Sequence, residues 1–193
     1  MGKADDVYRI TARKIERLNS ISDIGAGKGI LAELRRGVGK HPGEMPELWG
    51  MIFDDIPEEM LGKERASDTE WAVYTALTLY ALHRQGSDGD VFIKNVSVGK
   101  AAAGLVDSED DIQRVINRLN LVVTAVSRED LAYHLRGLIH LFRSRSISLD
   151  HALLAKEIYL FRNEDIANDI KLRWGRDFFC AVNNKTKGEN NNG

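Results

Sequence analysis

The sequence predicts an all-α fold, a bundle of helices, and three observations lead to this prediction. Apolar residues recur at helical spacing over long stretches, most clearly in the stripe of Leu131, Leu135, Leu138, Ile139 and Phe142. Residues that cap helix N-termini stand directly before several of these stretches. No convincing run alternates apolar and polar residues as a half-buried strand would.

The first half of the chain is expected to form three helices. The first covers residues 5–19, where apolar residues return every three or four positions. The second covers 29–36 and ends on Arg35 and Arg36, which is more positive charge than capping of a helix C-terminus needs. The third covers 67–83 and opens with a capping box. Because this third helix is apolar on most sides, we expect it at the centre of a bundle.

Residues 23–29 superficially resemble a phosphate-binding loop. Ser22 stands where the first glycine of that motif belongs, and Gly29 stands where its Ser or Thr belongs. No strand is expected before the segment, although such a loop follows a strand. We therefore exclude a nucleoside triphosphate site here.

A loop over residues 85–90 marks the boundary with the second half, where a short helix over 97–105 exposes Lys100. Further helices are expected to start at Ser108, at Ser127, at Ser148 with Asp150, and at Asn163. The polar segment 183–193 cannot bury apolar area, so we expect a disordered tail.

Length and composition limit the class of protein. A chain of 193 residues can bury a core without disulfides or metals, and Cys180 as the single cysteine excludes both a disulfide framework and a thiolate metal site. The acidic N-terminal segment is unlike a secretion signal, and no apolar stretch approaches about 18 residues. We therefore expect a cytoplasmic protein without membrane contact.

Charge is unevenly distributed along the chain. The net charge of −2 argues against a protein that coats nucleic acid with its whole surface. Residues 44–70 hold nine acidic side chains against two basic ones, whereas residues 114–176 hold eleven basic against seven acidic ones. One end of the molecule could repel a phosphate backbone while the other attracts it.

Arginines on two consecutive predicted helices form the main candidate site. Arg114 and Arg118 lie one turn apart, and Arg136 and Arg143 lie on the next helix, which should pack antiparallel to the first. Each alone could be an ordinary solvent-facing residue, but Arg114, Arg136 and Arg143 lack a carboxylate four residues later. Such a face could track phosphates, without reading bases because no aromatic row accompanies it.

Evidence for an enzyme is weak. The five histidines show no metal-binding spacing, and the paired carboxylates are sequence neighbours that suit helix starts and solvated loops. No nucleophile motif is present. We therefore expect no catalytic residue, no metal and no cofactor, and a helical hydrolase with an unrecognised metal site is the least favoured hypothesis.

Several short motifs together resemble one known family, the small subunit (CasB) of Cascade, the type I-E CRISPR surveillance complex. They are L-R-R-G at 34–37, V-S-V-G-K-A at 96–101, and, between 114 and 155, R-x-x-x-R, T-A-x-S, H-L-R-G-L-I and L-D-x-x-x-L-A. The resemblance extends over most of the chain in order, and the region 96–161 carries its specific part.

The resemblance implies two small helical bundles, which we place at 1–86 and 91–182, and a subunit without catalytic activity. It implies other Cascade subunits, guide RNA and target DNA as partners, two copies per complex, and stabilisation of the R-loop along with the displaced strand. Family basic positions correspond to Arg35, Arg36, Lys100, Arg114, Arg118 and Arg136, with Arg143 as an extension. Gly137 stands where relatives can carry a further basic residue.

A second hypothesis comes from another class of protein. The chain could be a helical protein–protein adaptor whose basic face docks an acidic partner and never meets nucleic acid. Steep loss of DNA affinity with rising salt separates the two, because only binding to a phosphate backbone releases its condensed counterions.

Overall fold

A computed structural model describes residues 2–22, 25–87 and 89–190 of the chain. This part contains nine α-helices and no strand, so the all-α prediction is confirmed. An isolated parallel bridge joins Phe92 to Leu149. None of the helices in the described ranges is both long and apolar enough to cross a membrane.

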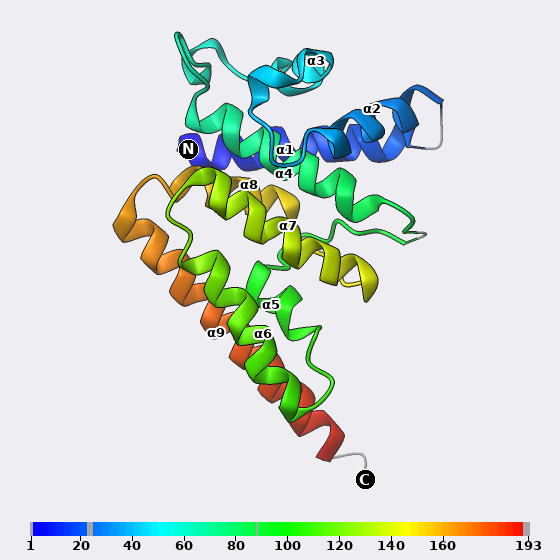
Figure 1. Cartoon of the computed structure of the whole chain (residues 1–193), viewed down its shortest axis with the longest axis vertical. Coiled ribbons are helices and arrows are strands. Elements are labelled where there is room, and N and C mark those ends of the chain that lie inside the picture. Colours follow the sequence, from blue (N-terminus) through cyan, green and yellow to red (C-terminus); the bar gives the residue numbers. More distant parts are fainter. Residues whose placement is uncertain (1, 23–24, 88, 191–193) are drawn as a thin grey trace.

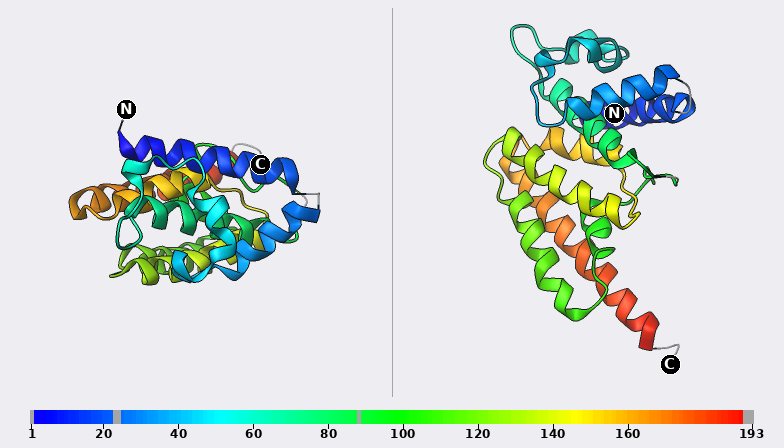
Figure 2. Two further views of the ribbon diagram at one scale, coloured as in Figure 1. Left: turned by 90° about the horizontal axis from the view of Figure 1, so that it is seen from above. Right: turned by 45° about the vertical axis from the view of Figure 1, so that its right-hand side comes forward.

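One end of the elongated molecule is built from the first part of the chain (Figures 1 and 2). Its helices are α1 (Lys3–Ile21), α2 (Gly25–Arg36), α3 (Trp49–Phe53) and α4 (Asp68–Arg84), with short 3-10 turns at Pro42–Glu44, Pro46–Leu48 and Glu58–Met60. The predicted loop-like segment 23–29 is helical from Gly25 onward, and residues 23 and 24 lie outside the described residues.

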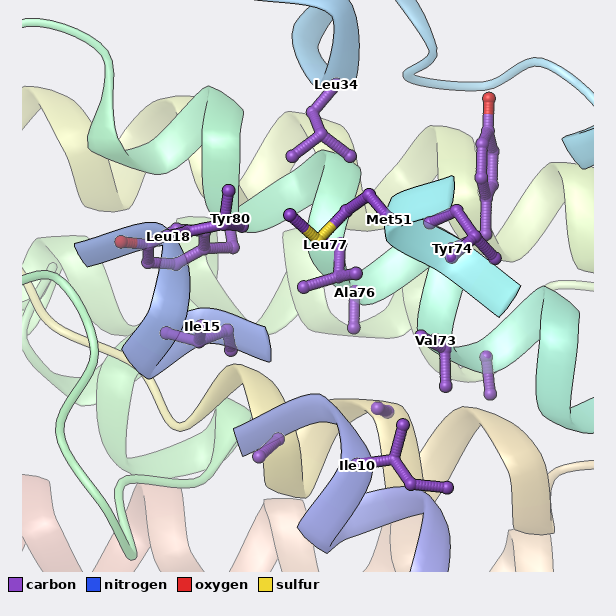
Figure 3. Packing of buried hydrophobic residues seen from close by; sticks show 14 of the residues in the cluster. Ile10, Ile15, Leu18, Leu34, Met51, Val73, Tyr74, Ala76, Leu77 and Tyr80 are labelled. Carbon is purple, nitrogen blue, oxygen red and sulfur yellow. The ribbon is translucent and has the colours of Figure 1, made fainter. Parts of the chain in front are cut away.

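Helix α4 lies at the centre, as predicted. Every residue from Thr69 to His83 is buried. Its start is fixed by the predicted capping box, in which the Ser67 hydroxyl accepts from the Glu70 N–H and the Glu70 carboxylate accepts from the Ser67 N–H. Figure 3 shows Leu77 and Tyr80 of this helix among the residues that fill the core between α1, α2 and α3.

The second part of the chain forms the other end. Its helices are α5 (Val98–Ala103), α6 (Glu109–Val123), α7 (Arg128–Ser144), α8 (His151–Leu160) and α9 (Glu164–Asn190). Each predicted start is found: Asn163 accepts from the Ile166 N–H ahead of α9, and Asp150 from the Leu153 N–H ahead of α8. Helix α9 extends to the far end of the molecule (Figure 1).

The buried side chains form two clusters, and these do not follow the predicted ranges 1–86 and 91–182. Helix α8 packs on α1 and α4, so that Ala152, Ala155 and Tyr159 belong to the first cluster while Leu154 belongs to the second. Helix α4 in turn places Leu79 in the second cluster. The division into two domains stays a prediction, and the buried contacts cross it.

The predicted tail over 183–193 differs from the structure. Helix α9 continues through this segment to Asn190, and residues 191–193 lie outside the described residues. The continuation is anchored near its start, because Lys185 donates to the backbone carbonyls of Ala103 and Val106. Composition alone does not show this anchor, since its acceptors lie about 80 positions earlier in the chain.

Candidate nucleic-acid interface

A groove between α6 and α7 brings together part of the predicted site. Its volume is about 520 Å³. Helix α6 supplies Arg118 and Leu121, and α7 supplies Tyr133, His134, Arg136, Gly137, Leu138 and His140. One face of α7 carries the positions 133, 136, 137 and 140, because consecutive turns of a helix bring residues three or four apart onto the same side. We call this feature the α6–α7 groove.

Arg118 and Arg136 carry the positive charge of the α6–α7 groove. Both side chains are exposed. Within the described ranges neither makes an ion pair or a side-chain hydrogen bond, so neither charge is neutralised by the protein itself. Two guanidinium groups on adjoining helices can therefore meet an anion from both sides of the groove, each with a planar fork that matches phosphate oxygens.

The same groove presents an aromatic ring that the sequence analysis did not single out. Tyr133 is 69% exposed, and Leu121 opposite on α6 is 43% exposed. The ring of His134 meets that of Tyr133 edge-on at 5.3 Å between centroids, while His134 Nε2 lies 3.1 Å from Asp130 Oδ1. The sequence does contain one signal for Tyr133 as a site residue: it lies three residues before Arg136, which places both side chains on one face of the helix.

His140 completes the lining on α7. Partial burial lowers the pKa of its imidazole, and the nearby charges of Arg143 and Arg136 lower it further. At neutral pH the ring is therefore uncharged and can serve as a hydrogen-bonding group.

Arg114 differs from the expectation of an unneutralised arginine. Its guanidinium pairs with Asp111, three residues earlier on α6. The sequence prediction rested on the lack of a carboxylate four residues after Arg114, and it did not include a partner before it. Hydrogen bonds from the backbone N–H groups of Asp107 and Ser108 also hold the pKa of Asp111 below its usual value. The carboxylate therefore stays ionised beside Arg114.

A smaller hollow of about 240 Å³ lies beside the groove, and Arg118 and Arg114 both line it. Arg145 lines it as well and pairs with Asp107 at 2.6 Å. Of these three arginines, Arg118 is the one without an acidic partner among the described residues.

Arg143 lies outside the α6–α7 groove. Its Nη1 donates to Gln85 Oε1 at 2.9 Å, which ties the end of α7 to the end of α4. Arg136 and Arg143 lie on the same helix, as predicted, but only Arg136 lines the groove among the described residues, and the charges of both arginines lower the pKa of His140.

The remaining predicted positions lie on other elements. Arg36 at the end of α2 pairs with Glu33, and it lies 3.5 Å from Glu47. Arg35 is half-buried, without an ion pair to any described residue. Lys100 on α5 is exposed, and its Nζ donates to the Asn95 carbonyl at 3.3 Å. None of the three lines the α6–α7 groove, and their roles stay predictions.

Metal chemistry has no site in the part of the chain that the structure describes, where no three His, Cys, Asp or Glu side chains gather closely enough to hold an ion. Cys180 is exposed as a free thiol. Glu157, a carboxyl whose pKa burial raises to about 7, lies between α8 and α9, where it accepts from Trp174 and pairs with Arg173. The partners of Glu157 join α8 to α9, so the raised pKa reflects packing of two helices and not a residue in a cleft.

Several known proteins are similar to this chain. A family model described as "CRISPR-associated protein Cse2" matches residues 30–179. The crystal structure of CasB from Thermobifida fusca has a TM-score of 0.77 and 30% identity, covering 90% of this chain and 97% of that one. Among curated protein sequences none matches.

Two further structures are similar in fold. A chain titled "CRISPR RNA-guided surveillance complex" has a TM-score of 0.73 at 18% identity, over 95% of this chain and 99% of that one. CasB from Thermus thermophilus has a TM-score of 0.65 at 19% identity, over 89% of this chain and 98% of that one. At these identities the likeness concerns the fold alone.

Proposed function

Because this chain belongs to the CRISPR-associated Cse2 family, we propose that it is a non-catalytic subunit of a CRISPR RNA-guided surveillance complex. Its task is to bind the sugar–phosphate backbone of nucleic acid and thereby stabilise the R-loop. Its partners are the other subunits, the guide RNA, the target DNA and a second copy of itself, and it works in the cytoplasm.

One observation supports nucleic-acid binding above the others: Arg118 and Arg136 adjoin one groove with no acidic partner among the described residues. Exposed guanidinium groups that the fold leaves unpaired are available to phosphates. Binding through them releases counterions, which supplies affinity without sequence readout.

A few such contacts are enough for the proposed role. Formation of an R-loop exchanges a DNA duplex for an RNA–DNA duplex of similar stability, so small contributions from backbone contacts decide whether it persists. A subunit of net charge −2 can supply them, because Arg118 and Arg136 are exposed at one groove without an acidic partner among the described residues. A modest net charge also limits unspecific binding of the free subunit.

The test is the salt dependence of binding to labelled single-stranded DNA or RNA, measured by fluorescence anisotropy between 50 and 300 mM salt. Each phosphate neutralised on a single strand contributes a slope of about −0.7 in a plot of log affinity against log salt. The double variant Arg118→Ala/Arg136→Ala is therefore expected to reduce the steepness by about 1.4.

Arg13→Ala is the matched control, since Arg13 is an exposed arginine on α1 outside the α6–α7 groove. It is expected to leave the slope near that of the unchanged protein. Affinity that is insensitive to salt, or equal effects of both substitutions, would contradict the proposal and favour the adaptor hypothesis.

A further inference from the structure

We propose that the α6–α7 groove binds an unpaired nucleotide, with its base stacked on the ring of Tyr133 and its flanking phosphates held by Arg118 and Arg136. This inference rests on the proposed function and goes beyond it, because it assigns a base contact and a strand state. The ligand class is single-stranded DNA or RNA, without preference among bases.

The exposure of Tyr133 is the first argument. Trp174, Tyr74 and Phe142 are less than 2% exposed. Trp49 and Phe179 are 45% and 49% exposed, and Tyr133 is more exposed than either, at 69%. Its hydroxyl has no hydrogen-bond partner among the described residues, and the ring contact that the structure gives Tyr133 is the edge-on one with His134, its neighbour in sequence. An exposed aromatic ring beside free cations is the combination with which proteins hold single strands.

The shape of the groove is the second argument. Gly137 follows Tyr133 by one helical turn, and a Cβ atom built on it meets nothing within 4 Å. The space next to the ring is therefore open on the helix surface. Leu121 adds an apolar wall from α6. The volume of about 520 Å³ falls within the range of pockets that hold small organic ligands.

The arrangement of the two arginines and the ring favours a single strand over a duplex as the ligand. Arg118 lines the groove from α6, and Arg136 lies three residues after Tyr133 on α7, so each of the two helices brings one cation to the groove that holds the ring. A strand that crosses the groove can place successive phosphates on the two arginines while its base lies on the ring. A base inside a duplex is already stacked on both faces, so only an unpaired base can make this contact.

The experiment compares three ligands on the full-length protein by anisotropy at one salt concentration: oligothymidylate, an abasic oligonucleotide of equal length, and a duplex. Tyr133→Ala removes the ring and Tyr133→Phe keeps it. Gly137→Leu fills the space beside the ring without changing charge. Phe179→Ala is the control, because Phe179 is a 49% exposed aromatic residue on α9 outside the groove.

The expected result is that Tyr133→Ala weakens oligothymidylate binding roughly fivefold to a hundredfold, as loss of a stacked base does in other single-strand sites. Gly137→Leu should weaken it likewise, while Tyr133→Phe and Phe179→Ala should not. Binding of the abasic strand should be weaker than that of oligothymidylate and unaffected by Tyr133→Ala.

Three outcomes would overturn the inference. Equal affinity of the unchanged protein for oligothymidylate and the abasic strand would show that no base is bound. An unchanged oligothymidylate affinity in Tyr133→Ala would show that the ring does not contribute. In both cases, a salt slope that still depends on Arg118 and Arg136 would leave the proposed function intact. Absence of any salt-dependent binding would instead overturn the proposed function along with the inference.

Discussion

At the scale of single residues, two arginines with similar positions in the sequence differ in whether a carboxylate already pairs with their charge. Arg114 and Arg118 lie one turn apart on α6, and both are exposed. Asp111 pairs with Arg114, whereas Arg118 has no acidic partner in the described ranges. A phosphate must compete with Asp111 for the first guanidinium but meets the second one free.

The two arginines are therefore expected to respond differently to removal. Arg118→Ala should weaken single-strand binding by about tenfold or more at 100 mM salt, because one charge-assisted hydrogen bond contributes about 1.5–3 kcal/mol. Arg114→Ala should weaken it less than about twofold, because an exposed ion pair holds its charge already. Parallel anisotropy titrations check this, and a larger loss for Arg114→Ala would contradict the assignment.

A second residue-scale feature is a buried histidine pair between α4 and α8. His83 Nδ1 lies 3.2 Å from His151 Nε2, and both side chains are fully buried. Burial lowers the pKa of His83 to about 4, with the charge of Arg143 acting in the same direction. Burial and the neighbouring His83 lower the pKa of His151 well below its ordinary value. Both rings are neutral in the folded protein.

Stability is therefore expected to fall on mild acidification. The unfolded histidines bind protons below about pH 6.5 and the folded ones do not, so the unfolded state gains protons as pH falls. His83 alone should remove about 2 kcal/mol from the free energy of unfolding between pH 7 and pH 5. Urea unfolding at the two pH values, compared between the unchanged protein and a variant without His83, measures this contribution.

Glu157 supplies the control because its effect has the opposite sign. Burial raises its pKa to about 7, so the folded state holds the proton more tightly and acidification stabilises it through this group. Glu157→Gln removes that opposing contribution. The variant should lose stability more steeply than the unchanged protein between pH 7 and pH 5, and an equal or shallower slope would refute the account.

At the scale of helices, packing and capping account for the motif residues. Gly99 of α5 lies against the backbone of Trp174 on α9, and a Cβ atom at this position would collide with the Trp174 carbonyl. The glycine in the V-S-V-G-K-A motif is thus explained by close approach of two helices. Gly137 on α7, by contrast, faces open space.

Alanine at these two glycines is expected to have opposite effects. Gly137→Ala should raise the free energy of unfolding by about 0.5–1 kcal/mol, because alanine favours an exposed helix and nothing obstructs its methyl group. Gly99→Ala should lower stability by about 1–3 kcal/mol, since α5 and α9 must move apart. Thermal unfolding of both variants measures these changes. A shift of the melting temperature in the same direction in both variants would contradict the close packing of Gly99 against α9.

Local signals in the sequence predicted most of the helices. The capping residues Ser67, Ser127 and Asn163 stand where helices begin, because their side chains satisfy N–H groups that the first turn leaves free. The start of α2 at Gly25 and the extension of α9 to Asn190 were not predicted, since glycines and polar residues give no such signal.

The candidate site was predictable in part. Helical spacing placed Arg118 and Arg136 on adjoining helices, and the structure brings both to one groove. Tyr133 was missed because exposure of an aromatic residue depends on which face the neighbouring helices leave uncovered. The pairing of Arg114 and the position of Arg143 depend on rotamers and on contacts distant in sequence.

At the scale of the whole molecule, α4 and α8 connect the two ends. Residues 1–86 alone would lack α8, which covers buried faces of α1 and α4. The same two helices also contribute to the second cluster, through Leu79 of α4 and Leu154 of α8. The division at 86–91 stays a prediction, and buried contacts of α4 and α8 lie on both sides of it.

The protein is therefore expected to unfold in one cooperative transition. Trp71 lies on α4 and Trp174 on α9, so in a Trp49→Phe background the variants Trp71→Phe and Trp174→Phe each leave one buried tryptophan as the fluorescent probe. Their urea midpoints should coincide with the circular dichroism transition of the same variant. Separate transitions for fluorescence and helix content would show independent domains.

The central claim, that this chain works within a nucleic-acid-guided complex, is tested most directly by its native partners. The measurement is purification of the tagged full chain from its own cells, nuclease treatment, and identification of the protein and RNA that remain bound. The account predicts a multi-protein complex that protects a uniform short RNA derived from CRISPR repeats. Recovery of protein partners without any RNA would contradict it.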